Sequence, residues 1–444
     1  MTLCRHRLCT VSLFLMGLGA LTKIYFLGTI SLSELGAFLI APIVFILNYK
    51  KIRDDGFLPF IWMVAIVMVS MFISSWYNST AFPYVVKSFA VLYSIFAHIV
   101  VFHKLLRDNY SAHGWYLLGV AISSVISIFY FNPTAMVSES GMSYIGEVEA
   151  EDIVAGPLFW VSKIVPWFTL PISAIYLKMP LLYSIMMPLI ATAVMVSTSV
   201  SGRSASLSIL LACALICLGR KSRHSMSAIG RHFVKLMILL VLVVVAGATA
   251  YKYTAAHGFL GEDARLKYEG QTRHSSSILS LLMSGRKEFF AAIPAVVDKP
   301  IVGHGPFARD TEGYWERFLS TYGDIEDLQG YYFMLKNNLG IPIIPTHSHI
   351  MGFWVFYGIG GLLFWIYVGI LIYQHIKKFT SAVPQWYGFL AIQISNFIWA
   401  LFFSPFGSRG TFTFMMCCIL FSRAIGQGRL QLPYEMEMEA RKYD

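Results

Sequence analysis

Long apolar runs constrain the fold of this chain more than any other feature. Each is about 18–25 residues long, enough to cross about 30 Å of hydrocarbon. The chain is 57% hydrophobic and 13% charged, whereas soluble globular chains carry roughly 25% charged residues. We therefore expect an all-α polytopic membrane protein with about twelve transmembrane helices. They are expected near residues 9–29, 33–49, 57–75, 83–103, 114–131, 154–177, 180–199, 204–219, 232–251, 349–374, 384–404 and 410–426.

Basic residues in the short connections indicate the orientation. Cytoplasmic loops of membrane proteins hold an excess of Lys and Arg. This rule predicts that both termini are cytoplasmic, and it explains the net charge of +10 without a nucleic-acid partner. The connections expected in the cytoplasm hold Arg5, Arg7, Lys50, Lys51, Arg53, Lys104, Arg107, Arg220, Lys221, Arg223, Lys377, Lys378 and Arg423.

One long hydrophilic segment, from about Lys252 to Ser348, then falls on the non-cytoplasmic side. Loops of this length are functional or disordered, and the many aromatic residues here favour short packed helices, expected at 275–283 and 285–297. The expected organisation is nine helices in 1–252, the loop in 253–348, three helices in 349–427 and a cytoplasmic tail in 428–444.

Two arginines on this outer side are candidates for binding an anion. Arg203 lies in a short turn where a basic residue has no role in orientation. It can extend to lipid phosphate, or pair with an anionic substrate group beside the small residues around it. Arg286 follows Ser284, which can cap a helix, and the free N–H groups at a helix amino terminus favour anions. A glycine-rich turn at 298–307, which contains His304, comes next.

Two histidines stand where the loop enters the tenth expected helix. His347 and His349 flank Ser348. An imidazole at the membrane boundary can accept a proton near neutral pH, or it can be a solvated interfacial side chain. We expect no metal site, because no nearby Cys or carboxylate cluster completes one.

The order of these patterns resembles the O-antigen ligase and polymerase superfamily. The ligase signature of that family is His, then Asn, Ser or Gln, nine residues, and Gly-x-x-Gly. Here His347 and Ser348 precede nine residues and the stretch from Gly358 to Gly361. The likeness covers about residues 190–365, and the earlier helices match only in hydropathy. It implies a GT-C-like fold in which the long loop, before helix 10, is periplasmic.

The resemblance also implies an activity. It is that of a metal-independent, inverting glycosyltransferase of the bacterial inner membrane that needs no cofactor. The donor would be a glycan on undecaprenyl diphosphate, and the acceptor a hydroxyl of lipid A-core or of another glycan, with membrane lipids around both. By position, Arg203 and Arg286 would bind the diphosphate and His347 would be the base. The further candidates for these roles are His349, His304 and Arg409.

Two other functions stay open at this point. A polymerase that extends the glycan on its own carrier shares the general loop pattern, although the His-Ser signature favours the ligase. A transporter or flippase would need ionisable residues at mid-membrane depth, where the sequence offers few, chiefly Lys87 and Lys163.

Overall fold

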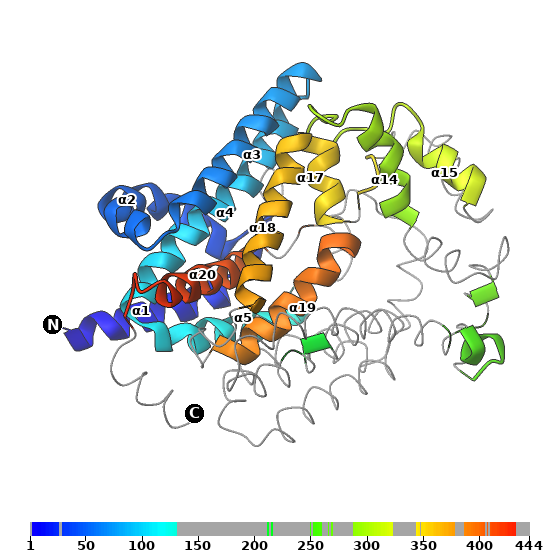
Figure 1. Cartoon of the computed structure of the whole chain (residues 1–444). Helices are drawn as coiled ribbons and strands as arrows, with labels where there is room; N and C mark the ends of the chain where they lie inside the picture. The colour runs from blue at the N-terminus through cyan, green and yellow to red at the C-terminus, as the bar shows by residue number, and fades with distance from the viewer. Residues whose placement is uncertain are drawn as a thin grey trace.

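The computed structural model is mostly helical, and four of its helices, α1, α2, α3 and α20, pack against the long helix α4 (Phe82–Asp108; Figure 1). It describes residues 2–25, 29–130, 287–322, 343–346, 348–377, 386–404, 406 and 409–431, and shorter pieces between 211 and 269. The expected helices between 154 and 251 lie outside the described residues, apart from Leu211, Ala212, Leu215 and Thr249.

Most of the expected helices within the described residues are confirmed, with ends that differ by a few residues. Four of them are long and apolar enough to cross a membrane: Leu32–Asp54, Leu58–Tyr77, Phe82–Arg107 and Ile359–Ile376. The helices are α1 (Thr2–Leu18), α2 (Leu32–Asp54), α3 (Leu58–Tyr77), α4 (Phe82–Asp108), the short 3-10 helix η1 (Tyr110–Ala112), α5 (His113–Tyr130), α14 (Lys287–Asp298), α15 (Tyr314–Tyr322), α17 (His349–Tyr357), α18 (Ile359–Lys377), α19 (Tyr387–Phe403) and α20 (Arg409–Gly426).

The first expected helix, 9–29, is wrong in its second half. Helix α1 ends at Leu18, and the chain continues as an antiparallel hairpin of strands β1 (Lys23–Tyr25) and β2 (Thr29–Ser31). Hydropathy counts the apolar residues of this segment but does not distinguish helix from strand. The Thr22 side chain donates to the carbonyl of Leu18, which satisfies an acceptor at the helix end.

Close backbone approach joins α1 to α5. A Cβ atom on Gly17 would overlap the carbonyl oxygen of Tyr116, and one on Gly119 would overlap that of Phe14. Small residues allow such contact between helices in membranes, where dispersion forces replace the hydrophobic effect. The two glycines therefore fix this helix pair.

The tenth expected helix, 349–374, is also wrong as one continuous span. It is broken at Gly358 into α17 and α18, which lie side by side in an antiparallel hairpin (Figure 1). Phe353 of α17 stacks on Phe364 of α18, with ring centroids 5.8 Å apart, and contacts Trp365 at 5.0 Å. Helix α17 is nine residues long and rises about 13 Å alongside α18. We call it the re-entrant helix because the chain turns back on itself at Gly358.

The described part of the long loop contains α14 and α15. Helix α14 confirms the helix expected at 285–297, within two residues at its start. The buried Asp310 carboxylate accepts from the N–H groups of Tyr314 and Trp315, at 2.8 and 2.7 Å, and so caps α15. Helix α14 packs its alanines against Val355 of α17, which places the loop helices beside the re-entrant helix.

Near its carboxyl end, α4 is joined by polar contacts to the connection between α2 and α3. The Asp55 carboxylate is buried between α2 and α3 and accepts from His103 Nε2 at 2.8 Å and from Arg107 Nε at 2.7 Å. Burial by itself would raise the pKa of Asp55, but these two hydrogen bonds outweigh it and hold the pKa below its usual value.

Candidate functional site

The two glycine motifs of the sequence meet in space. The N–H of Ile359 donates to the carbonyl of Ile301 at 2.9 Å, and the N–H of His304 donates to the carbonyl of Val355 at 2.7 Å. A Cβ atom on Gly303 would lie 2.6 Å from the amide nitrogen of Gly358. The glycine turn of the loop therefore packs directly on the break between α17 and α18, although about fifty residues separate them in the chain.

Each glycine at this break has a steric reason. Gly358 has φ +66° and ψ −149°, a backbone conformation that only glycine adopts readily. A Cβ atom on Gly360 would overlap the Ser70 side chain, and one on Gly361 would overlap the Phe353 carbonyl. The Gly-x-x-Gly half of the signature thus forms the turn between the helices, and the nine residues before it are α17.

Helix α3 holds this contact from a third side. Ser74 Oγ donates to the carbonyl of Phe356 at 2.9 Å, and Asn78 Nδ2 donates to the carbonyl of Gly303 at 2.9 Å. Lys299 Nζ donates to Asn78 Oδ1 at 2.9 Å. Loop, re-entrant helix and α3 are therefore joined by polar contacts at one end of the bundle, which we call the loop end.

His304 ties the loop to itself. Its Nε2 lies 2.8 Å from the carbonyl oxygen of Ala295, which can only accept, so Nε2 carries the proton. Burial lowers the pKa of His304, and the bond to Ala295 only partly offsets this. His304 Nε2 donates to the carbonyl of Ala295 in α14, and the His304 backbone N–H donates to that of Val355 in α17. His304 therefore holds the glycine turn in place between these two helices.

His349 is buried at the amino end of α17 and is 7% exposed. Its Nδ1 lies 2.7 Å from the carbonyl oxygen of Ser404, so Nδ1 carries the proton and Nε2 holds the lone pair. Trp365 and Phe406 contact the ring, each at 5.1 Å between centroids. The solvated interfacial position considered for this histidine is therefore wrong, because α17 begins inside the bundle, where the His349 ring is enclosed by aromatic side chains.

Ser348 fixes the start of α17. Its Oγ accepts from the N–H of Met351 at 3.2 Å, as a helix cap does, and donates to the carbonyl of Leu401 at 2.8 Å. The Ser of the His-Ser step therefore joins α17 to the carboxyl end of α19.

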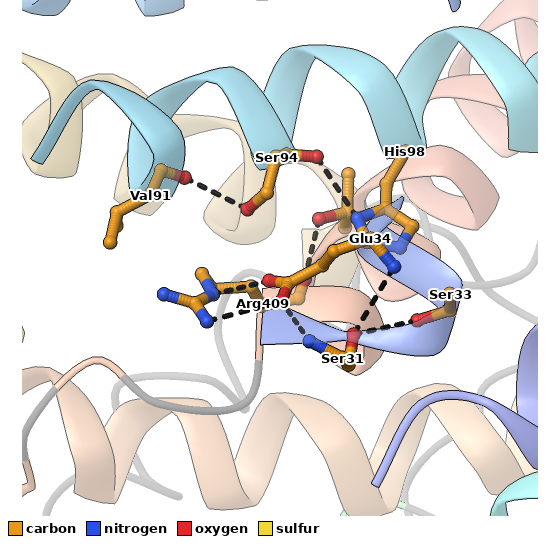
Figure 2. A network of polar contacts seen from close by, with 8 residues as sticks. Ser31, Ser33, Glu34, Val91, Ser94, His98 and Arg409 are labelled. Atoms are coloured by element: carbon orange, nitrogen blue, oxygen red, sulfur yellow. Dashed lines mark hydrogen bonds and ion pairs between the residues drawn. The ribbon is translucent and has the colours of Figure 1, made fainter. Parts of the chain in front are cut away.

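Arg409, at the amino end of α20, forms a buried ion pair with Glu34 of α2 (Figure 2). Arg409 Nε and Nη2 donate to the two carboxylate oxygens at 2.5 and 3.2 Å, and the N–H of Ser31 donates to Glu34 Oε2 at 2.7 Å. Ser31 Oγ accepts in return from the N–H of Glu34, which completes a capping box. Both oxygens of Glu34 are thus occupied, and Arg409 is already engaged with a carboxylate.

Two polar atoms beside this ion pair have no hydrogen-bond partner in the described structure. They are His98 Nε2 and the Tyr116 hydroxyl, both fully buried. A Cβ atom on Gly410 would lie 3.9 Å from the first and 3.3 Å from the second. His98 lies roughly 24 Å along α4 from Phe82, at about 1.5 Å per residue. The network is therefore deep in the helix bundle.

The sequence-predicted centre is only partly visible. Arg203, Arg286 and His347 lie outside the described residues. Of the further candidates, the structure places His304 in the loop turn and His349 at the amino end of α17. It places Arg409 in the ion pair with Glu34. Sequence reasoning missed Glu34, although the Ser-x-x-Glu pattern before an apolar run is the signal of a capping box. Among the described residues, no group of three His, Cys, Asp or Glu side chains could hold a metal ion.

Comparisons with known proteins add no relative. The chain matches no family model, and no curated protein or solved structure is significantly similar to it.

Proposed function

We propose that this protein is an inner-membrane glycosyltransferase. It moves a glycan from undecaprenyl diphosphate to a sugar hydroxyl on the periplasmic face, and the preferred acceptor is lipid A-core, as in an O-antigen ligase. The helices long enough to cross a membrane support the location. The positive-inside rule supports the orientation, because the last turns of α2, α4 and α20 carry basic residues at the end opposite the loop.

The observation that carries the proposal is the contact between the two glycine motifs. The family likeness rests on short patterns in one order, and each is weak alone. Gly303 and Gly358 belong to different patterns, yet their backbones touch, and the segments around them are joined by backbone hydrogen bonds. Patterns that form one packed unit are better support for a shared site than patterns that merely follow each other.

The proposed chemistry needs two groups of residues. Arg203 and Arg286 bind the diphosphate and neutralise the charge that develops on it as it leaves. His347 takes the proton of the acceptor hydroxyl while its oxygen attacks the anomeric carbon. The bond from that carbon to the diphosphate oxygen breaks, undecaprenyl diphosphate leaves with the electron pair, and attack from the opposite face inverts the carbon.

His349 is the alternative base. Its Nδ1 is committed to Ser404, so its Nε2 lone pair is the one available to accept a proton. Ser348 separates the two histidines and is itself buried. The assignments of His347 and of His349 as the base can be tested apart. Only the residue that acts as the base should be indispensable when it is replaced by a side chain that keeps its structural hydrogen bonds.

The test uses purified variants supplied with the lipid-linked donor and lipid A-core. His347→Ala, Arg203→Ala and Arg286→Ala should each abolish transfer, while His257→Ala, an exposed loop histidine, should leave it intact. His349→Asn keeps a donor for Ser404 and should retain activity. If His347→Ala were active and His349→Asn inactive, the base would be His349. Activity lost to EDTA and restored by Mg²⁺ or Zn²⁺ would overturn the metal-independent mechanism.

Two candidates compete with the ligase. A polymerase would extend the donor glycan itself when no lipid A-core is present, and the acceptor that grows distinguishes the two. A transporter or flippase is favoured by the Glu34–Arg409 pair beside His98, because buried ionisable residues and interrupted helices are common at transport sites. The occupied oxygens of Glu34 favour a structural ion pair instead.

A further inference from the structure

Exposed aromatic residues mark the corner between α3 and α4. Trp76, Tyr77 and Phe82 are 87%, 68% and 77% exposed. Large aromatic side chains gather where a membrane helix meets the lipid headgroups. Both helices are long and apolar enough to cross a membrane, so this corner lies at the level of the lipid phosphates.

A lysine from the first turns of α4 reaches the loop at this corner. Lys87 is half-buried, and its Nζ lies 4.5 Å from the ring centroid of Phe307. Phe307 is held by Tyr84 and Phe356, each at 6.0 Å between ring centroids. A lysine in an apolar helix extends towards the interface, and the face of an aromatic ring attracts but does not neutralise its charge.

Two more cations come from the loop. Arg309 is exposed, and its Nη2 donates to the Tyr84 hydroxyl at 3.1 Å. Tyr84 and Lys87 are three positions apart on α4 and so share one face. Lys299 reaches the end of α3, where its Nζ donates to the neutral Asn78. Three positive side chains, one from α4 and two from the loop, therefore contact residues at this corner.

Two carboxylates of the loop adjoin the cations in sequence, Asp298 beside Lys299 and Asp310 beside Arg309, and both accept hydrogen bonds from neutral groups. Asp310 caps α15, and Asp298 accepts from the Tyr314 hydroxyl at 2.9 Å. Within the described residues, Lys87 contacts the Phe307 ring and Lys299 donates to the Asn78 amide. Lys87 and Arg309 contact a ring and a hydroxyl in the interactions above, so they bring positive charge to the corner at the depth of lipid phosphate.

We propose that Lys87 and Arg309, flanked by Lys299, bind the phosphate of a membrane lipid whose headgroup carries two negative charges, such as a phosphomonoester or a diphosphate. Converging cations favour such a group over a zwitterionic phosphodiester, and the Tyr84 and Phe307 rings pack against the upper acyl chain. The site stands on the contacts at this corner and does not depend on the proposed glycan transfer.

The experiment measures lipid retention by the full-length protein with native mass spectrometry. Wild-type protein in mixed micelles of phosphatidic acid and phosphatidylcholine should retain phosphatidic acid preferentially. Lys87→Gln/Arg309→Gln should weaken that retention roughly 25-fold, at roughly fivefold for each cation. The matched control, Lys50→Gln/Lys51→Gln, removes the same charge from exposed positions at the far end of α2 and should retain the lipid as the wild type does.

Three results would overturn the site. They are unchanged retention in the Lys87 and Arg309 variant, an equal loss in the control variant, and displacement of the lipid by millimolar inorganic phosphate alone. The last would assign the cations to free phosphate and not to a lipid. Matching melting temperatures of all three proteins keep a folding defect from producing the loss.

Discussion

Replacing Gly358 with alanine tests the contact on which the site is built. The new Cβ atom would overlap the Ile301 carbonyl oxygen and lie 2.5 Å from the Ile301 carbonyl carbon. The backbone conformation at Gly358 costs a non-glycine residue about 1–3 kcal/mol, and forcing the loop away costs about 1–3 kcal/mol more. The loop would also lose the hydrogen bond from Ile359 to Ile301. We expect Gly358→Ala to lower the free energy of unfolding by about 2–6 kcal/mol.

The assay combines thermal unfolding in detergent with limited proteolysis of the loop. Gly358→Ala should melt several degrees below the wild type, and the segment at 299–311 should be cut faster. Gly369→Ala is the matched control, because it lies within α18 and an added Cβ meets no atom within 4 Å. It should be neutral or stabilising by up to about 1 kcal/mol. A Gly358→Ala protein as stable and as protected as Gly369→Ala would refute the packing described here.

Three further predictions concern the polar contacts. Glu34→Gln removes the carboxylate charge of the ion pair with Arg409 and should destabilise the protein by about 3–5 kcal/mol. Adding Arg409→Met should recover much of the loss, and chemical unfolding of the two variants checks both effects. Ser348→Ala removes the cap of α17 and the donor to Leu401, and should cost about 2 kcal/mol in the same assay. The pKa of Asp55 is held below its usual value of 3.8, so its contribution to stability is present above pH 3.8 and is lost as the pH falls through the lowered pKa. A pH titration of stability in wild type and Asp55→Asn should diverge above that range and converge below it.

The sequence predicted the helices well and their interruptions poorly. Apolar runs give helix positions because each run must satisfy its own backbone in lipid. The break at Gly358 depends on the carbonyl of Ile301, a residue distant in the chain. From the sequence alone, the apolar run 349–374 is therefore indistinguishable from one continuous span. His349 was placed at the boundary for the same reason. The pair of Glu34 and Arg409 joins the start of α2 to the start of α20, and no local pattern connects them.

The glycine patterns were predicted with the right residues but without their physical role. The sequence presents them as parts of a substrate site. In the structure, Gly303, Gly358 and Gly361 are needed where backbones touch, and Gly360 is needed where the Ser70 side chain packs. The glycines contribute no side chain that could react, so the reactive groups of the proposed site are the Arg and His residues that the family resemblance implies.

The most direct measurement of the central claim separates transfer from transport. Metal-stripped purified protein, reconstituted in liposomes, would be given undecaprenyl-diphosphate glycan and lipid A-core, and the products would be analysed by mass spectrometry. We expect glycan covalently joined to lipid A-core, release of undecaprenyl diphosphate, and loss of both with His347→Ala. Donor that crosses the bilayer unchanged, with no new glycosidic bond to either acceptor, would contradict it.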